Sequence, residues 1–559
     1  MVFQKSNLLV KTAKNCRFFK DINIIRSKKL KFKFKLSRGY IMDGIKAMPF
    51  VTEEQLSSKE IKNKIRSECE KLINFCDGEK ENDVREGISF FEFEKTLKTL
   101  FASFGCLFIQ LFLAAGHERL DYSKWTDTNL YYARKNPIAR AIKTVFGEVK
   151  YWRTYLIRKD NIGNGFHPLD AVLGLTRDGF SPSVMSLVTR LATRVSFKSS
   201  VLIYTYFYDW SPSTESIESL VLGIGRNAGN YMEVVDPPEG DGEVLIIESD
   251  GKATPTATEE ELNKRRGERK GKKTSCCNRH RSKQKRKKSK RKRRKKGDKS
   301  KNGRSITIVV MYTLKRGSDG LLHGPINKIV WASYAPRKVM LAWARRQATK
   351  RGFPPDTNKR IHIAVDGEKC LKDGFEKLFP HVTFALDIRH VEEYLWKVGR
   401  AFFSEGSDEL HKEVEELKSM LYEGRSSELI SLLKEWYNEL SPRAKRDEKR
   451  RDILSTTIKY MESRLDMMNY KEYIDEDLPI ASGIVEGAAR YVVGERMDCS
   501  GMRWIPERAE ALLHLRCIEL NGDWDRFFDW EYGRWKDKLL NEEKVLIRTN
   551  EPMELPDAA

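Results

Sequence analysis

The chain has 559 residues, of which 40% are hydrophobic and 33% are charged, a composition that excludes a wholly disordered protein. The length suits about three or four domains. The net charge of +23 is uneven, because residues 264–304 carry +22 and residues 1–40 carry +11, which leaves −10 for the remainder. The folded bulk is therefore mildly acidic, and the two basic segments are typical of solvated arms that bind polyanions.

The nine cysteines are scattered and show no metal-ligand spacing, which favours a reduced, cytoplasmic protein. Cys276 and Cys277 with His280 suggest zinc, but no second ligand pair follows them. The longest uncharged run, residues 99–116, is marginal for a bilayer span and contains Gln110, so we expect a buried helix or a dimer face and no membrane contact.

Residues 1–50 are expected to form a basic arm. This arm resembles a transit peptide and lacks the apolar core of a secretory signal. A DNA-contacting arm, or a start codon assigned too far upstream, explains its basic composition equally well. Residues 51–240 are predicted to be a mainly helical DNA-binding region. Helical spacing covers residues 52–120, and residues 143–158 predict a β-hairpin around a Gly-Glu turn.

Further helices are expected over residues 182–194 and 196–207. Residues 196–225 then give a helix, a Ser-Pro turn and a second helix capped at Ser213 or Thr214. This is the outline of a helix-turn-helix, whose second helix enters a major groove. Two ordinary packed helices have the same outline, so both interpretations stay open.

From residue 241 the pattern changes to short β-type runs. Five strands are predicted, over residues 243–249, 305–315, 327–335, 361–365 and 382–386. Their order, strand-strand-strand-helix-strand-helix-strand-helix, is that of a ribonuclease H-like fold. We expect the first part of this α/β core over 241–407, an all-helical insertion over 408–475, the last core helices over 476–535 and a tail over 536–559.

Three acids occupy special places in this order. Asp250 ends the first strand, Asp366 ends the fourth, and Glu486 lies one turn into a helix with Ser482 as N-cap. The first and fourth strands are neighbours in this fold, so the three carboxylates should converge. Such an oxygen-rich site suits two Mg²⁺ ions, with Mn²⁺ as a substitute. An acid after a strand is also common in plain turns, and Glu248 is the acid most easily confused with Asp250.

Several motifs resemble one family. "ESDGKATPT", "VDGE", "DIRHVEEYLW" and above all "PIASGIVEGAARYVVGERMDCSGMRW" look like the ISKra-type insertion-sequence transposases, bacterial DDE enzymes related to the Mutator-like transposases. The resemblance covers roughly residues 140–530. It implies that Asp250, Asp366 and Glu486 are the three catalytic, metal-binding acids. It also implies that Asp387 and His390, which match the relatives' acid-and-histidine pattern, are catalytic, and that a helical insertion precedes the glutamate.

A basic insertion, residues 263–304, separates the first two strands and departs from the family pattern. Within residues 281–296, 13 of 16 residues are basic and none is aromatic, which favours phosphate contacts over base stacking. The DNA-binding candidates are Arg286, Lys287, Lys288, Arg291, Arg293, Arg294, Arg490 and Arg503.

These features predict a DDE transposase that cleaves DNA at transposon ends and joins them to target DNA, with metal ions as cofactor. Its expected partner is double-stranded DNA, it is expected to act as a homo-oligomer, and its expected location is the cytoplasm, at the nucleoid. Two other interpretations stay open: a structure-selective nuclease on the same fold, and a non-catalytic basic nucleic-acid-binding protein.

Overall fold

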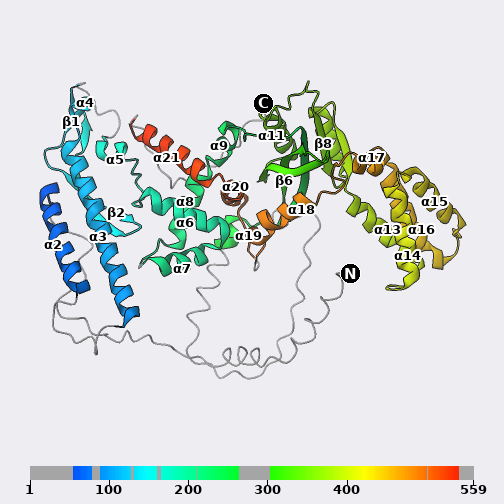
Figure 1. The fold of residues 1–559 in the computed structure, drawn as a ribbon, viewed down its shortest axis with the longest axis horizontal. Coiled ribbons are helices and arrows are strands. Elements are labelled where there is room, and N and C mark those ends of the chain that lie inside the picture. Colours follow the sequence, from blue (N-terminus) through cyan, green and yellow to red (C-terminus); the bar gives the residue numbers. More distant parts are fainter. Residues whose placement is uncertain are drawn as a thin grey trace.

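The computed structural model describes residues 55–77, 89–127, 131–159, 165–208, 210–263, 303–499 and 502–540. It is a mixed α/β structure, mostly helical, built around one five-stranded mixed sheet (Figure 1). The N-terminal arm, the centre of the basic insertion with its cysteine pair, and the end of the tail lie outside the described residues.

The N-terminal region is mainly helical, as predicted, with two small two-stranded sheets. Its elements up to the first sheets are α2 (Ser58–Asp77), α3 (Phe90–Arg119), α4 (Ser123–Thr126), β1 (Tyr131–Ala133), β2 (Ile138–Thr144), β3 (Gly147–Arg153) and β4 (Leu156–Arg158).

The predicted hairpin is present, but the predicted position of its turn is wrong. Strands β2 and β3 pair with Thr144 opposite Gly147, so Val145 and Phe146 form the turn and the Gly-Glu pair begins β3. The reason is local hydrogen bonding. The Thr144 hydroxyl donates to the Gly147 carbonyl (2.8 Å) and accepts from the Phe146 N–H (3.2 Å), which closes the turn early.

Helix α3 contains the long uncharged run. Among the described residues it is the one helix long and apolar enough to cross a membrane, and 39% of its apolar window is buried within the protein. It packs against α2 and β3, and Gln110 on its buried side donates to the Lys150 carbonyl (3.2 Å). Part of its other side is exposed, including Phe101, Phe108 and Phe112.

The centre of the molecule is helical. It consists of α5 (Pro168–Val172), α6 (Pro182–Arg194), α7 (Phe197–Phe207), α8 (Thr214–Gly225), α9 (Ala228–Val234), α20 (Pro506–Asn521) and α21 (Trp524–Leu540). Residues 509–519 of α20 are all buried, because this helix contacts α6, α8, α9 and strand β7 at once. Helix α20 thereby joins the N-terminal region to the sheet.

The sheet has the order β7-β6-β5-β8-β9. Its strands are β5 (Val244–Thr254), β6 (Arg304–Arg316), β7 (Leu322–Ser333), β8 (Arg360–Val365) and β9 (Thr383–Leu386). Strands β5, β6 and β7 are antiparallel neighbours, whereas β8 runs parallel to β5 and β9 parallel to β8. Helices α11 (Arg337–Lys350) and α12 (Lys369–Leu378) connect β7 to β8 and β8 to β9. All five predicted strands are thus confirmed.

Strand β5 is longer than predicted, and this changes the place of Asp250. Residues 250–254 continue to pair with β6, from Asp250 opposite Ile308 to Thr254 opposite Arg304. Asp250 therefore lies inside the strand and not at its end, because β6 still supplies partners where β8 has stopped. Thr254 and Arg304 also show that the basic insertion leaves and rejoins the sheet at neighbouring positions.

The helices predicted over residues 408–475 are present. Figure 1 shows them as a group beside the sheet, opposite the N-terminal region. After α13 (Ile388–Phe402) come α14 (Asp408–Tyr422), α15 (Ser426–Glu439), α16 (Lys445–Glu462), the 3₁₀ turn η2 (Leu465–Met467) and α17 (Tyr470–Asp475). The chain then forms α18 (Gly483–Ala488), the π-helix η3 (Ala489–Gly494) and α19 (Glu495–Met497), and α18 packs on β5 and β6.

Candidate functional site

Asp250 and Asp366 lie side by side. In the parallel pair β5–β8 the last partners are Ser249 and Val365, so the next residues of the two strands are the two acids. Burial raises the pKa of the Asp250 carboxyl, the N–H of Gly251 (2.6 Å) lowers it, and the charge of Asp366 raises it again. The nearby His390 side chain acts in the opposite direction and lowers the pKa of Asp250. The sheet therefore brings together two acids 116 positions apart in the sequence.

The loop after β8 is fixed by the helical insertion. Gly367 has φ +82°, a conformation that side chains other than glycine rarely adopt, and a Cβ there would meet Arg464. The Arg464 side chain donates to the Gly367 carbonyl (2.7 Å), and the Tyr460 hydroxyl donates to the Asp366 carbonyl (3.1 Å). These contacts from the end of α16 hold the Asp366 backbone in place.

Glu486 projects from α18, and Glu248 anchors that helix. Glu248 is fully buried and accepts from the Tyr312 hydroxyl (2.8 Å) and from the Val485 N–H (2.8 Å). Burial raises the pKa of the Glu248 carboxyl to about 7. Both of its oxygens are used inside the protein, so Glu248 and Asp250, two residues apart on one strand, have different surroundings. Only Asp250 is partly exposed.

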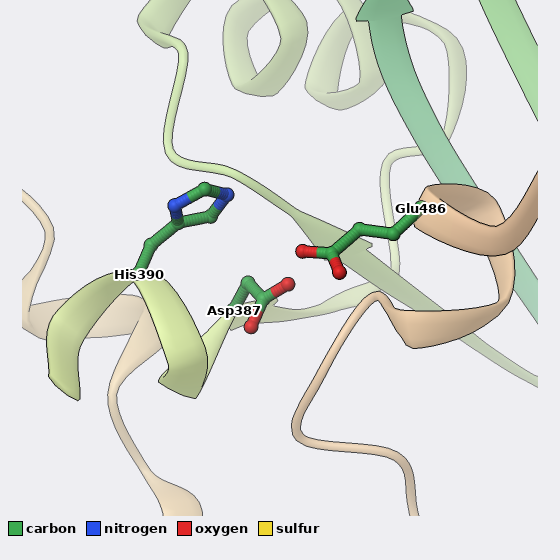
Figure 2. Close-up of side chains that lie close together, drawn as sticks. All are labelled: Asp387, His390 and Glu486. Carbon is green, nitrogen blue, oxygen red and sulfur yellow. The ribbon is translucent and has the colours of Figure 1, made fainter. Parts of the chain in front are cut away.

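His390, Asp387 and Glu486 form a group of possible metal ligands. One ligand atom from each lies within 4.8 Å of the others, and Figure 2 shows the Glu486 carboxylate extending from α18 toward the two residues at the start of α13. Glu486 is exposed, and none of the described residues gives its carboxylate a hydrogen bond or an ion pair. Of the three acids predicted to bind metal, only Glu486 belongs to this group; Asp250 and Asp366 do not.

Asp387 is the most enclosed member of the group. It is fully buried and is the N-cap of α13, with Oδ1 accepting from the Arg389 N–H (2.8 Å). Oδ2 accepts from both the N–H (3.0 Å) and the hydroxyl of Ser482. Ser482 does precede α18, but its side chain makes no cap bond to that helix. Ser482 is thus the N-cap residue of α18, as predicted, but its hydroxyl bonds to the buried Asp387 carboxylate instead of to the helix.

The residues present fit a divalent cation. Carboxylate oxygens are the ligands that suit Mg²⁺ and Mn²⁺, whereas an imidazole nitrogen suits transition metals such as Zn²⁺ or iron. Asp250 and Asp366 repel each other electrostatically, and a cation between them would relieve this repulsion. Asp250 with Asp366, and Glu486 with His390, are the residues that would hold such ions. The hydrogen bonds of Asp387 suit it better to supporting the site than to binding metal.

The DNA-binding candidates have mixed positions. Those between Arg286 and Arg294 lie outside the described residues. Arg490 is exposed. The helix changes from α to π at Ala489, so the spacing of four residues does not by itself place Arg490 on the same face as Glu486. Arg503 is paired with Glu261 (3.3 Å), which balances its charge within the protein.

The two helices of the predicted helix-turn-helix are present as α7 and α8. Helix α8 carries Glu215 and Glu218 and no basic residue, and it buries Ile217, Leu220 and Ile224 against its neighbours, which include α20. A recognition helix needs an exposed face that contacts DNA. The surroundings of α8 therefore argue against this role.

A scan against protein-family models finds no match to this chain. A search of curated proteins finds no relative either.

Proposed function

We propose that this protein is a DDE transposase of an insertion sequence, which cleaves DNA at the element's ends and joins them to target DNA. Its sheet is then a ribonuclease H-like core with a helical insertion. The strand order β7-β6-β5-β8-β9, with the first three strands antiparallel and the last two parallel, supports this proposal.

One observation carries the proposal. Asp250 on β5 and Asp366 after β8 are neighbours, and His390 lies close enough to Asp250 to lower its pKa. Glu486 of α18 lies in one group with His390 and Asp387. Divalent ions at such a site activate a water or a 3′-hydroxyl and stabilise the leaving oxygen of a phosphodiester. Asp250, Asp366 and Glu486 bind and position the ions. His390, half-buried at the start of α13, would contact the scissile phosphate or order the metal site.

The remaining buried groups keep this arrangement rigid. Glu248 holds the start of α18 through Val485, and Asp387 holds it through Ser482. Glu486 follows directly after these two anchor points. Catalysis by positioning and charge depends on such fixed supports, because a displacement of about 1 Å costs about 100-fold in rate.

A strand-transfer assay tests the proposal. The substrate is duplex DNA from the two borders of the protein's own gene, with a plasmid as target and Mg²⁺ present. We expect joined products from the wild type and at least about a 1000-fold loss in Asp250→Asn, Asp366→Asn and Glu486→Gln, with DNA binding retained. Glu435→Gln, an exposed acid on α15, is the matched control and should stay active.

The other outcomes separate the alternatives. Cleavage without joining would identify a nuclease on the same fold. DNA binding without any cleavage, unchanged in all three variants, would identify a non-catalytic basic protein. Chelation of the metal with EDTA should abolish joining and leave DNA binding, since the basic segments need no metal.

A further inference from the structure

A second charged site lies beyond the acidic one. A cavity of about 430 Å³ opens between the start of α7, helix α8 and the segment that leads into α20. Its lining includes Phe197, Lys198, Arg496, Trp504 and Arg508. The proposed catalytic function does not use this cavity.

Arg496 is the unusual residue of this cavity, because it is 2% exposed and its charge has no acidic partner among the described residues. Nε donates to the Ala192 carbonyl (2.8 Å), and Nη1 contacts only the Sδ of Met502 (3.9 Å), a weak acceptor. Nη2 is buried without any hydrogen-bond partner. Burying a charged guanidinium with an unpaired N–H group destabilises the fold, and a bound anion would offset this cost by accepting a hydrogen bond and balancing the charge.

The walls of the cavity hold this guanidinium in place and leave it charged. It lies 5.3 Å from the ring centre of Phe197 and 5.1 Å from that of Trp504. Trp504 is itself fixed, since its indole N–H donates to the Met497 carbonyl (2.7 Å) and its backbone N–H to the Pro255 carbonyl (3.1 Å). The aromatic rings prevent Arg496 from turning toward a distant carboxylate.

The rim of the cavity adds positive charge. Lys198 is exposed and has no ion-pair partner among the described residues, and it lies at the beginning of α7, where the helix dipole is positive. Arg508 is neutralised by Glu218 (3.2 Å) and Glu259 (2.9 Å). Lys198 and Arg496 are thus the two cations left for a ligand.

A buried arginine nearby provides a comparison. Arg516 is 3% exposed, but its guanidinium donates to the carbonyls of Tyr491, Val492 and Thr193. Its hydrogen-bonding capacity is used within the protein, so burial alone does not explain the unpaired nitrogen of Arg496.

We propose that Arg496 and Lys198 form a phosphate-binding subsite that takes a backbone phosphate of DNA. The proposal rests on the proposed function only in naming DNA as the source of the phosphate. Arg496 lies ten residues after Glu486 on the helical path through α18, the π-helix η3 and α19, so the two positions are at most about 15 Å apart along that path. That distance spans a few nucleotides, so one strand can reach the acidic site and the subsite together.

The first experiment uses inorganic phosphate and the full-length protein. Phosphate should raise the Tm of the wild type relative to chloride at the same ionic strength, and Arg496→Met should lose this response. Arg516→Met is the matched control: it should lower the Tm but keep the response to phosphate. An equal response in Arg496→Met and the wild type, or none in the wild type, would overturn the subsite.

The second experiment uses duplex DNA without metal, so that cleavage plays no part. Lys198→Gln and Arg496→Lys, two milder changes that guard against misfolding, should each weaken binding about 10-fold. Lys198→Gln, which removes a charge, should also flatten the dependence of log K on log salt by about 0.9, whereas Arg496→Lys keeps its charge and should leave that slope unchanged. If neither variant changes DNA affinity, the phosphate does not come from DNA and the proposal is wrong. Neither measurement needs catalysis. A wild-type protein that binds phosphate and DNA as expected but shows no strand transfer would therefore contradict only the proposed function.

Discussion

The buried carboxylate of Asp387 is bound to Ser482, which lies 95 positions further along the chain, through both the backbone N–H and the hydroxyl of the serine. This link ties the start of α13, which carries His390, to the start of α18, which carries Glu486. The two sides of the candidate site therefore share one buried hydrogen-bonded support, and its removal should affect stability and activity together.

The Asp387–Ser482 link can be measured by a double-mutant cycle. Asp387→Asn should destabilise the fold, because an amide N–H would face the N–H of Ser482, and Ser482→Ala should do so to a smaller extent. We expect a coupling of about 1–2 kcal/mol in urea unfolding, since the two residues are in direct contact. Strictly additive effects would show that the link contributes nothing. Strand transfer should fall in both single variants while DNA binding persists.

Glu248 and Asp250 should respond in opposite ways to the same kind of substitution. Glu248→Gln can accept from Val485 and donate to Tyr312, so we expect nearly wild-type stability and activity. Glu248→Ala leaves both donors unpaired and should cost about 2–4 kcal/mol. Asp250→Asn should remain folded and lose strand transfer. Unfolding curves and the joining assay, run side by side, check this, and a fully active Asp250→Asn would reverse the assignment of the two acids.

The basic insertion should be removable without loss of the sheet. Thr254 and Arg304 pair across β5 and β6, and residues 255–257 contact Trp504, so a short Gly-Ser linker in place of residues 264–302 leaves both strands and these contacts intact. We expect a change in Tm of only a few degrees. The DNA affinity should fall. The slope of log K against log salt concentration should become flatter by about 0.9 for each phosphate that the insertion neutralises in the wild type. Fluorescence anisotropy between about 50 and 200 mM salt measures this; an unchanged slope would contradict DNA binding by the insertion.

His362 should make the fold sensitive to acid. Its ring is buried between the Thr383 hydroxyl (2.8 Å) and the Pro479 carbonyl (2.9 Å), and burial lowers its pKa to about 4. The folded state thus favours the neutral ring. The stability that it contributes is present above pH about 6.5 and is lost as pH falls toward about 4, up to about 3 kcal/mol.

Unfolding free energies measured across this pH range test the role of His362. His362→Gln should reduce the slope of the unfolding free energy against pH by the amount that corresponds to nearly one bound proton. His381→Gln, at an exposed histidine, should keep the wild-type curve. If both variants follow the wild type, another group is responsible for the acid sensitivity.

The amino-acid sequence by itself determined the local structure of this protein. Short runs of β-forming apolar residues located all five strands of the sheet, and helical spacing located the helices between His390 and Glu486. These patterns are readable because backbone periodicity is a local property. The adjacency of Asp250 and Asp366 followed from the strand order, and the register of β5 with β8 places the two acids side by side.

Only the tertiary structure decided what each polar residue does. Glu248 and Asp250 differ because Val485, more than 230 residues away, donates to one of them. Arg503 is neutralised by Glu261, whereas Arg496 is buried without an acidic partner among the described residues. Such roles depend on which distant groups share a buried, low-dielectric space, and neither spacing nor composition encodes that directly.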